Sequence, residues 1–225
     1  MAQISADTIQ FFSDLKENNS REWFNDNRKK YDLAKENFIG FTNELIAAIA
    51  SIDDTIGTLE AKDCIFRIFR DVRFSPNKAP YKTNMGAYIA RGGRKSPYAG
   101  YYFHIEPNNS FISGGIYMAP PNIMTSIRKD IETYPDTFIG IVEDESFKKT
   151  FVNLGGESLK RVPTGFSAQS PVAEYLKLKH ITPHCPMSDS ELLSPNVFSR
   201  IVDVYMQMKP LVGLLNASIE QEILG

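Results

Sequence analysis

The chain has 225 residues, of which 42% are hydrophobic and 23% charged, and this composition excludes a fibrous or intrinsically disordered protein. No stretch approaches the roughly 18 uninterrupted apolar residues of a membrane span, and the N-terminus lacks the basic and apolar regions of a signal peptide. Cys64 and Cys185 are the only cysteines, too few for a disulfide framework. We therefore expect a soluble, cytoplasmic protein without a membrane partner.

The first fifty residues predict three helices. Residues 6–17 place Ile9, Phe12 and Leu15 on one side, with Ser5 or Asp7 as the cap. Ser20 predicts the start of a second helix, which carries Trp23 and Phe24. A long amphipathic helix is expected over roughly 28–50, where apolar residues recur at spacings of three and four: Tyr31, Ala34, Phe38, Phe41, Leu45 and Ile49.

The next sixty residues read as strands. They are short, rich in aromatic and β-branched residues and separated by turn signals, among which Pro107–Asn108–Asn109 indicates a hairpin. No room is left between them for crossover helices, so the sheet should be largely antiparallel. The expected strands are 64–69, 85–91, 99–106 and 111–118.

Helical patterns return after Pro120–Pro121. Three apolar stripes follow, then a short helix over 171–177 and an irregular, proline-rich stretch over 181–187. Ser194–Pro195 is a cap and first-turn pair that should open the last helix, and Pro210 should kink or stop that helix. The three stripes are Met124, Ile127 and Ile131; Phe138, Ile141 and Val142; and Phe147, Phe151 and Leu154.

This order of elements predicts an α+β fold, in which a mostly antiparallel sheet of about four to six strands packs against N-terminal and C-terminal helices. No linker rich in Gly, Ser or Pro divides the chain. We therefore expect one domain over 1–225, helical over 1–55, strand-rich over 60–120, and helical and mixed over 121–225.

Positive charge is concentrated in one part of the chain. Between Cys64 and Ser110 there are eight Lys and Arg residues but only two acids, a net charge of +6. The whole chain carries −2, so the remainder carries −8. Such a basic band attracts a small anion, or nucleic acid if it spreads over one face, and the pI near 6.0 favours the small anion.

The densest part of this band is RIFRDVRFSPNKAPYKTN, residues 67–84. Arginine presents a planar fork of donors that suits carboxylate or phosphate, and Asp71 could orient one of these forks. Whether the segment is extended or helical, its spacing gathers the charges together. The candidate ligand-binding residues are Arg67, Arg70, Asp71, Arg73, Lys78, Tyr81 and Lys82.

The spacing Arg67-x-x-Arg70-Asp71-x-Arg73-Phe74-x-x-x-Lys78-x-x-Tyr81 resembles the hallmark of a bacterial family known as domain of unknown function 2461. The similarity extends to Lys82–Thr83–Asn84, Gly114–Met118, Arg128 and Val162–Phe166, and so to nearly the whole chain. That family has no assigned activity. The resemblance therefore implies a family-defining group of residues without giving them roles.

Several functions remain open for the basic segment. Its charges could be solvated and paired, with little energetic consequence. It could bind a small phosphate- or carboxylate-bearing ligand, or act in phosphoryl or nucleotidyl transfer with Asp71 or Tyr81 as the proton-transfer group. A nucleic-acid interface would add the basic turn at Arg91, Arg94 and Lys95.

Other chemistry has less support in the sequence. Pro183 and Pro186 disturb the spacing that His180, His184 and Cys185 would need as metal ligands, so no metal site is predicted. The segment 91–96 lacks the spacing of a phosphate-binding loop. No nucleophile elbow is present, and no cofactor can be named.

Overall fold

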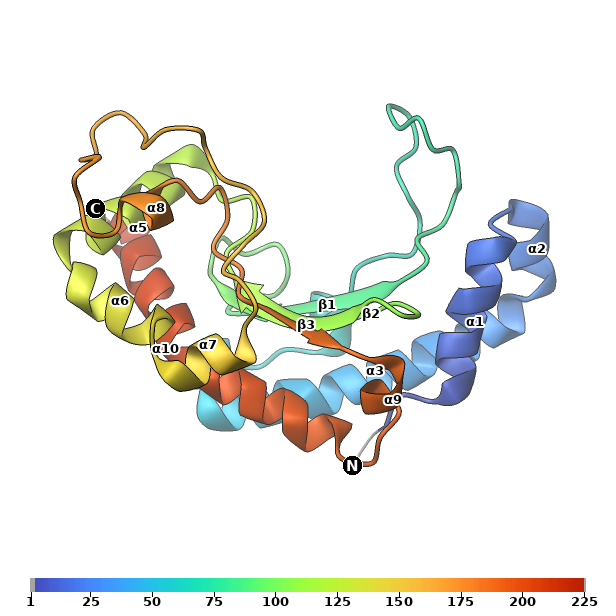
Figure 1. The fold of residues 1–225 in the computed structure, drawn as a ribbon. Helices are drawn as coiled ribbons and strands as arrows, with labels where there is room; N and C mark the ends of the chain where they lie inside the picture. Colours follow the sequence, from blue (N-terminus) through green and yellow to red (C-terminus); the bar gives the residue numbers. More distant parts are fainter. Residues whose placement is uncertain (1–2, 225) are drawn as a thin grey trace.

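The computed structural model describes residues 3–224 and shows an α+β protein (Figure 1). A four-stranded antiparallel sheet crosses the middle of the molecule, and N-terminal and C-terminal helices lie beneath it. The fold class expected from the sequence is confirmed.

The N-terminal helices begin where the sequence places their caps. Helix α1 (Ala6–Glu17) starts after Ser5, whose hydroxyl accepts from the Thr8 amide, and α2 (Arg21–Asp26) starts after Ser20, whose hydroxyl accepts from Trp23. Helix α3 (Arg28–Ile52) follows, and every apolar position of its expected stripe is buried. Two short helices precede the sheet, η1 (Asp54–Ile56) and α4 (Ala61–Cys64).

The sheet has the order β1-β2-β3-β4, and every neighbouring pair is antiparallel. Strand β4 pairs with β3 after a long excursion through the helices, with Ile112 opposite Cys185. The strands are β1 (Met85–Ala90), β2 (Gly100–Ile105), β3 (Ser110–Gly115) and β4 (His184–Met187).

The second half of the chain is mainly helical. Its longest helix, α10, lies beside α3 below the sheet (Figure 1). The helices are α5 (Pro121–Thr133), α6 (Pro135–Val142), α7 (Glu145–Thr150), α8 (Ala173–Leu176), α9 (Asp189–Leu192) and α10 (Val197–Leu224).

One face of the sheet packs on α3 and α10. Successive side chains of a strand point to opposite faces, so Tyr101 and Phe103 of β2 share the covered face. The Phe103 ring lies 5.3 Å from Phe41 of α3, and the Tyr101 ring lies 5.1 Å from Tyr205 of α10, centroid to centroid. The Tyr101 hydroxyl also donates to Asp53 over 2.7 Å, which ties the sheet to the end of α3.

The opposite face of the sheet carries a different set of residues. Glycine, tyrosine, histidine and serine alternate there with the core positions, and none of the helices within residues 3–224 covers their centre (Figure 1). The residues of this open face include Gly86, Tyr88, Tyr102, His104, Phe111, Ser113 and His184.

The strand expected at 64–69 is wrong. A capping box between Glu60 and Asp63 starts α4 and takes Cys64 into that helix. The chain then forms two isolated bridges, Ile65 with Ala87 and Phe69 with Tyr81, rather than a continuous strand.

One expectation for the C-terminal half is also wrong. The stretch 181–187, expected to be irregular, contains β4, which is an edge strand where Pro186 is tolerated because an outward N–H is not needed. Of the two effects expected for Pro210, a kink or a stop, the stop does not occur, because α10 continues through Pro210. Pro210 is exposed, and Met206, four residues earlier, is also exposed, so water can satisfy the carbonyl group that loses its partner.

None of the helices within residues 3–224 combines the length and the apolar character that crossing a lipid bilayer requires.

Arg128 of α5 should be a main stabilising residue of the second half. It is buried, and its guanidinium donates to the carbonyl oxygens of Leu176 (2.8 Å) and Leu178 (2.9 Å). Arg128→Met should lower the free energy of unfolding by about 1–3 kcal/mol because both acceptors lose their partner. Lys129→Met, at the exposed neighbouring position, should change it by less than about 0.5 kcal/mol in the same urea titration. Equal effects of the two substitutions would contradict this assignment.

Candidate functional site

A cavity of about 820 Å³ lies over the open face of the sheet. Its floor is formed by side chains of all four strands, and its rim by the segments before β1, between β1 and β2, after β3 and before β4. The aromatic residues that line it are Phe66, Tyr88, Tyr98, Tyr102, His104, Phe111, Tyr117 and His184. Its volume is in the range of small-molecule sites.

One wall of the cavity comes from residues 65–84, here called the arm, which rises from the sheet next to α1 and α2 (Figure 1). Two backbone hydrogen bonds connect its outgoing and returning halves, from Lys82 to the Ile68 carbonyl (2.8 Å) and from Arg70 to the Pro80 carbonyl (3.0 Å). The arm is therefore an irregular hairpin that carries the basic motif.

Three motif residues hold the arm together. The Arg70 guanidinium donates to the Ala79 carbonyl over 3.0 Å, and the Lys78 ammonium donates to the Val72 carbonyl over 3.0 Å. Tyr81 is buried, and its ring stacks on Phe24 of α2 at 4.0 Å. The sequence did not point to Asn19, whose side-chain amide bonds both the N–H and the carbonyl of Tyr81.

Asp71 and Arg73 pair with each other on the surface of the arm. The guanidinium of Arg73 donates to both carboxylate oxygens of Asp71, at 2.9 and 2.6 Å, and both side chains are exposed. This hydrogen bonding to Arg73 lowers the pKa of Asp71. Neither residue lines the cavity.

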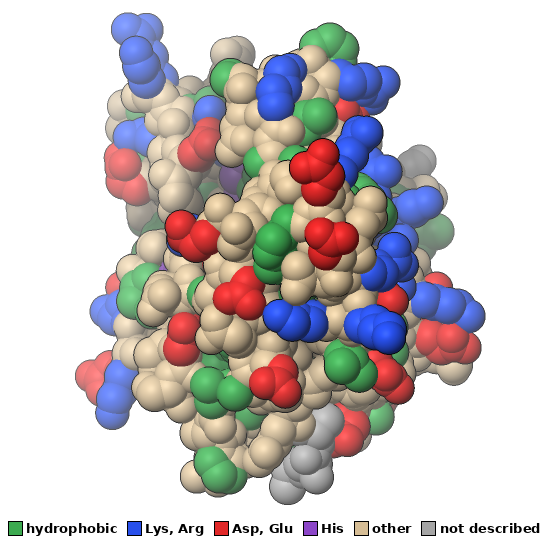
Figure 2. Space-filling view, turned by 90° about the vertical axis from the view of Figure 1, so that its right-hand side faces the viewer, with side chains coloured by type: hydrophobic (Ala, Val, Ile, Leu, Met, Phe, Trp, Pro, Cys, Tyr) green, Lys and Arg blue, Asp and Glu red, His purple; other side chains and the backbone are tan. Residues whose placement is uncertain are grey.

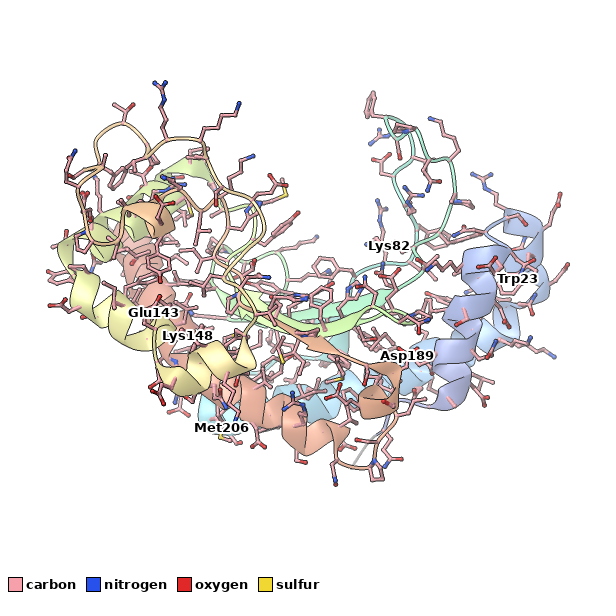
Figure 3. All side chains as sticks on the ribbon, viewed as in Figure 1. Trp23, Lys82, Glu143, Lys148, Asp189 and Met206 are labelled. Atoms are coloured by element: carbon pink, nitrogen blue, oxygen red, sulfur yellow. The ribbon has the colours of Figure 1, made fainter. Side chains whose placement is uncertain are left out.

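Lys82 is the motif residue that lines the cavity. Figure 3 shows it where the arm leaves the sheet. Its side chain is partly buried and lies over the Phe66 ring at 5.6 Å. Burial, together with the nearby positive charge of Arg67, lowers the pKa of the Lys82 ammonium. Within residues 3–224, neither cation makes a hydrogen bond or salt bridge to an acidic group, although Arg67 interacts at longer range with the Asp71 carboxylate.

Beside Lys82, strand β2 and the residue that follows it carry three polar side chains at alternate positions, Tyr102, His104 and Glu106. The Tyr102 hydroxyl and His104 Nδ1 are 2.9 Å apart, and His104 Nε2 lies 3.5 Å from a carboxylate oxygen of Glu106. Thr83 and Asn109 donate to the two oxygens of Glu106 and hold it in place. The basic motif did not point to this tyrosine or this histidine. The spacing Tyr-x-His-x-Glu on one strand was the available signal.

This row of residues, Tyr102–His104–Glu106, is closely packed. A methyl group at Gly86 would lie 2.3 Å from the Tyr102 hydroxyl, so the glycine leaves room for the tyrosine. His104 stacks on Phe111 at 4.5 Å, and Phe111 lies 4.7 Å from the ring of His184. Burial lowers the pKa of both histidines. It raises the pKa of Tyr102 to about 12, so its hydroxyl keeps its proton at neutral pH.

The charge of the cavity lining is positive. Lys82 and Arg94 are its charged residues, and no Asp or Glu belongs to it in the part of the chain that the structure describes. Arg94 donates one hydrogen bond to the Lys62 carbonyl, over 2.6 Å. Arg91, from the same turn, instead pairs with Glu220 and stacks on Tyr98.

The outer surface beside α1 and α2 is mixed in charge. Lys and Arg side chains gather along one edge of this face, and Asp and Glu occupy its middle (Figure 2). Among the described residues, no three His, Cys, Asp or Glu side chains come close enough to hold a metal ion. The cavity, with its unpaired cations, hydroxyls and imidazoles, can bind an anion and exchange protons with it.

A family model described as "Conserved hypothetical protein (DUF2461)" matches residues 7–213, and the chain belongs to this family. No curated protein and no solved structure matches the chain.

Arg70 and Arg73 provide a matched test of how the arm is held. Arg70→Met should loosen the arm, because the Ala79 carbonyl loses its charged donor at a cost of about 1–3 kcal/mol. Limited digestion with chymotrypsin should then cut faster at Phe69 or Phe74, which are both exposed. Arg73→Met should leave the rate of cutting unchanged, since its pair with Asp71 is exposed. Faster cutting in both variants would argue against a structural role specific to Arg70.

The buried histidines should make stability depend on pH. The pKa of His104 is lowered in the folded protein, so the unfolded chain takes up a proton first as the pH falls. Stability is therefore complete above about pH 6.5 and is lost below it. Between pH 7 and pH 5.5, His104→Gln should lose less unfolding free energy than the wild type in urea titrations. A loss as large as in the wild type would contradict the burial of a neutral His104.

Proposed function

We propose that the cavity over the sheet binds a small ligand that carries a phosphate or carboxylate group and an aromatic ring. Lys82 and the nearby Arg67 supply the positive charge, and the tyrosine, phenylalanine and histidine side chains of the sheet supply the floor. This retains the anion-binding function expected from the sequence and centres it on Lys82.

The observation that carries the proposal is the unpaired ammonium of Lys82 at the base of the arm. Lys82 is partly buried, the exposed Arg67 lies close enough to lower its pKa, and the described residues that line the cavity include no carboxylate. Partial burial and a neighbouring like charge both raise the free energy of the empty site. A bound anion would remove this cost, whereas a cationic or neutral ligand would not.

The lining explains why the ligand should also have an aromatic part. Six Phe and Tyr side chains line the cavity in addition to two histidines. Phe66 and Tyr117 lie at its rim and are exposed, 38% and 67% respectively. Aromatic rings pack against one another in stacked or edge-to-face arrangements worth about 0.5–1.5 kcal/mol beyond the area they bury. An anion with a planar ring would use both features of the cavity.

The remaining motif residues contribute through the arm. Arg70, Lys78 and Tyr81 fix the backbone that presents Lys82, and the Asp71–Arg73 pair lies on its outer surface. We therefore assign ligand contact to Lys82, longer-range attraction of the anion to Arg67, and positioning to Arg70, Lys78 and Tyr81. Asp71 and Tyr81 have no place in this proposal as proton-transfer groups, because the first is paired on the surface and the second is stacked in the core.

Thermal unfolding with a small panel of compounds tests the proposal. Inorganic phosphate, phenyl phosphate and phenylacetate should raise the melting temperature, phenyl phosphate more than inorganic phosphate, and uncharged benzyl alcohol should not. A ligand at about 100 times its dissociation constant adds about 2.7 kcal/mol of stability. Sodium chloride at matched ionic strength controls for general screening. If none of the three anions stabilises the protein beyond the chloride control, the proposal is wrong.

Variants locate the binding. Lys82→Met should weaken phenyl phosphate binding at least about tenfold, since a hydrogen bond to a charged group contributes about 1.5–3 kcal/mol. Lys82→Arg keeps the positive charge and should retain most of the affinity. This result would attribute the loss in Lys82→Met to the missing charge and not to misfolding. Arg73→Met removes the same charge from the same motif outside the cavity and should change affinity less than about twofold. Equal losses in Lys82→Met and Arg73→Met would place the anion elsewhere.

A further inference from the structure

The Tyr102–His104–Glu106 row contains a buried nitrogen atom whose neighbouring carboxylate lies at the outer limit of hydrogen-bond distance. His104 is 91% buried, given its exposure of 9%, and its Nε2 atom makes no hydrogen bond among the described residues, although Glu106 lies 3.5 Å away. Buried polar atoms without a partner are rare and often belong to functional sites. Here the atom faces a carboxylate, which would attract a positive imidazolium.

The carboxylate determines which tautomer a neutral His104 adopts. A proton on Nε2 points toward Glu106, whereas a bare Nε2 would place its lone pair against the negative charge. Nδ1 is then an acceptor, so the single proton of Tyr102 is used in the 2.9 Å bond to His104. In this state Tyr102 cannot donate to a ligand.

Protonation of His104 reverses this bond. An added proton on Nδ1 makes that atom a donor to the Tyr102 oxygen. The tyrosine keeps its own proton, and its O–H group can then rotate toward the cavity, whose lining includes Tyr102. The new positive charge lies between Glu106 and the cavity. One proton is gained from solvent, and no covalent bond other than the N–H bond forms.

We infer that Tyr102, His104 and Glu106 form an acid–base relay, in which His104 takes up a proton when an anion binds and Tyr102 donates a hydrogen bond to that anion. The inference rests on the proposed function of the same cavity. It identifies two binding residues that the motif does not contain. It also gives the site a proton that it can hold beside the bound group, as general acid catalysis requires.

The groups around His104 explain why the free protein resists this protonation. Glu106, just after the end of β2, favours the charged form, but burial, Lys82 before β1 and His184 on β4 all oppose it, and together they lower the pKa of His104. Phe111 on β3 contributes a stacked apolar ring. An anion beside Lys82 offsets the opposing positive charge and so raises the pKa of the imidazole.

Calorimetric titration with phenyl phosphate tests the relay. Measurements in buffers of different ionisation enthalpy give the number of protons taken up on binding, and the phosphate itself contributes because its second pKa is near 6. The wild type should take up as much as one proton more per ligand than His104→Gln. Its affinity should also fall more steeply from pH 6 to pH 8, by at most an additional factor of about ten per pH unit.

Two further variants separate the roles. Tyr102→Phe should weaken binding about tenfold at pH 6, where the hydroxyl would donate to the ligand. His180→Gln removes a histidine that does not line the cavity and should behave as the wild type. In the free protein, nitrogen-15 spectra of His104 should show the Nε2–H tautomer at pH 8.

The possible outcomes distinguish the two proposals. Phenyl phosphate binding with equal proton uptake in wild type and His104→Gln would overturn the relay and leave anion binding intact. The Nδ1–H tautomer in the free protein would also overturn the relay. Absence of phenyl phosphate binding at every pH would overturn both.

Discussion

The packing of one sheet face on α3 and α10 is the constraint on which the rest of the structure depends. Strand residues alternate, so burying Tyr101 and Phe103 among the aromatic rings of these helices places Tyr102 and His104 on the other face. No helix covers the centre of that face, and its side chains become the floor of a cavity. The alternation of side chains along the strands therefore fixes both the core and the candidate site. A shift of β2 by one residue in its pairing register would move its core side chains to the open face and its cavity side chains to the core.

The arm and the turn after β1 supply positive charge to the cavity, which the strands do not carry there. The four strands present tyrosines, histidines and a serine to the cavity, but positive charge comes from the segments at either end of β1, through Lys82 and Arg94. The stacking of Tyr81 on Phe24 joins the arm to α2, and Asn19 fixes the backbone on both sides of Tyr81. Most of the motif therefore holds the arm, and with it Lys82, beside the cavity, so few of its charged residues reach the cavity lining.

The two proposals use adjacent parts of one surface. Lys82 interacts with both Arg67 and His104, so the charge proposed to attract an anion also adds to the effect of burial that keeps the histidine neutral. In the proposed relay, binding and protonation are linked through this ammonium group. The linkage is reciprocal, since a proton on His104 would raise the affinity for the anion by the same factor as a bound anion raises the affinity for the proton.

The sequence determined the α+β class, the limits of α1, the approximate positions of α3 and the hairpin strands, and the family, because helical periodicity, caps and a long motif are local signals. It also indicated that the arm is chemically important. Only the tertiary structure decided which cations lie unpaired beside a cavity, since Arg73 and Lys82 look alike in a sequence and differ in whether a partner folds against them. The proposed relay could not be predicted from the sequence for the same reason. Alternation shows that Tyr102, His104 and Glu106 share a face, but only the packing of the helices shows that this face is the open one.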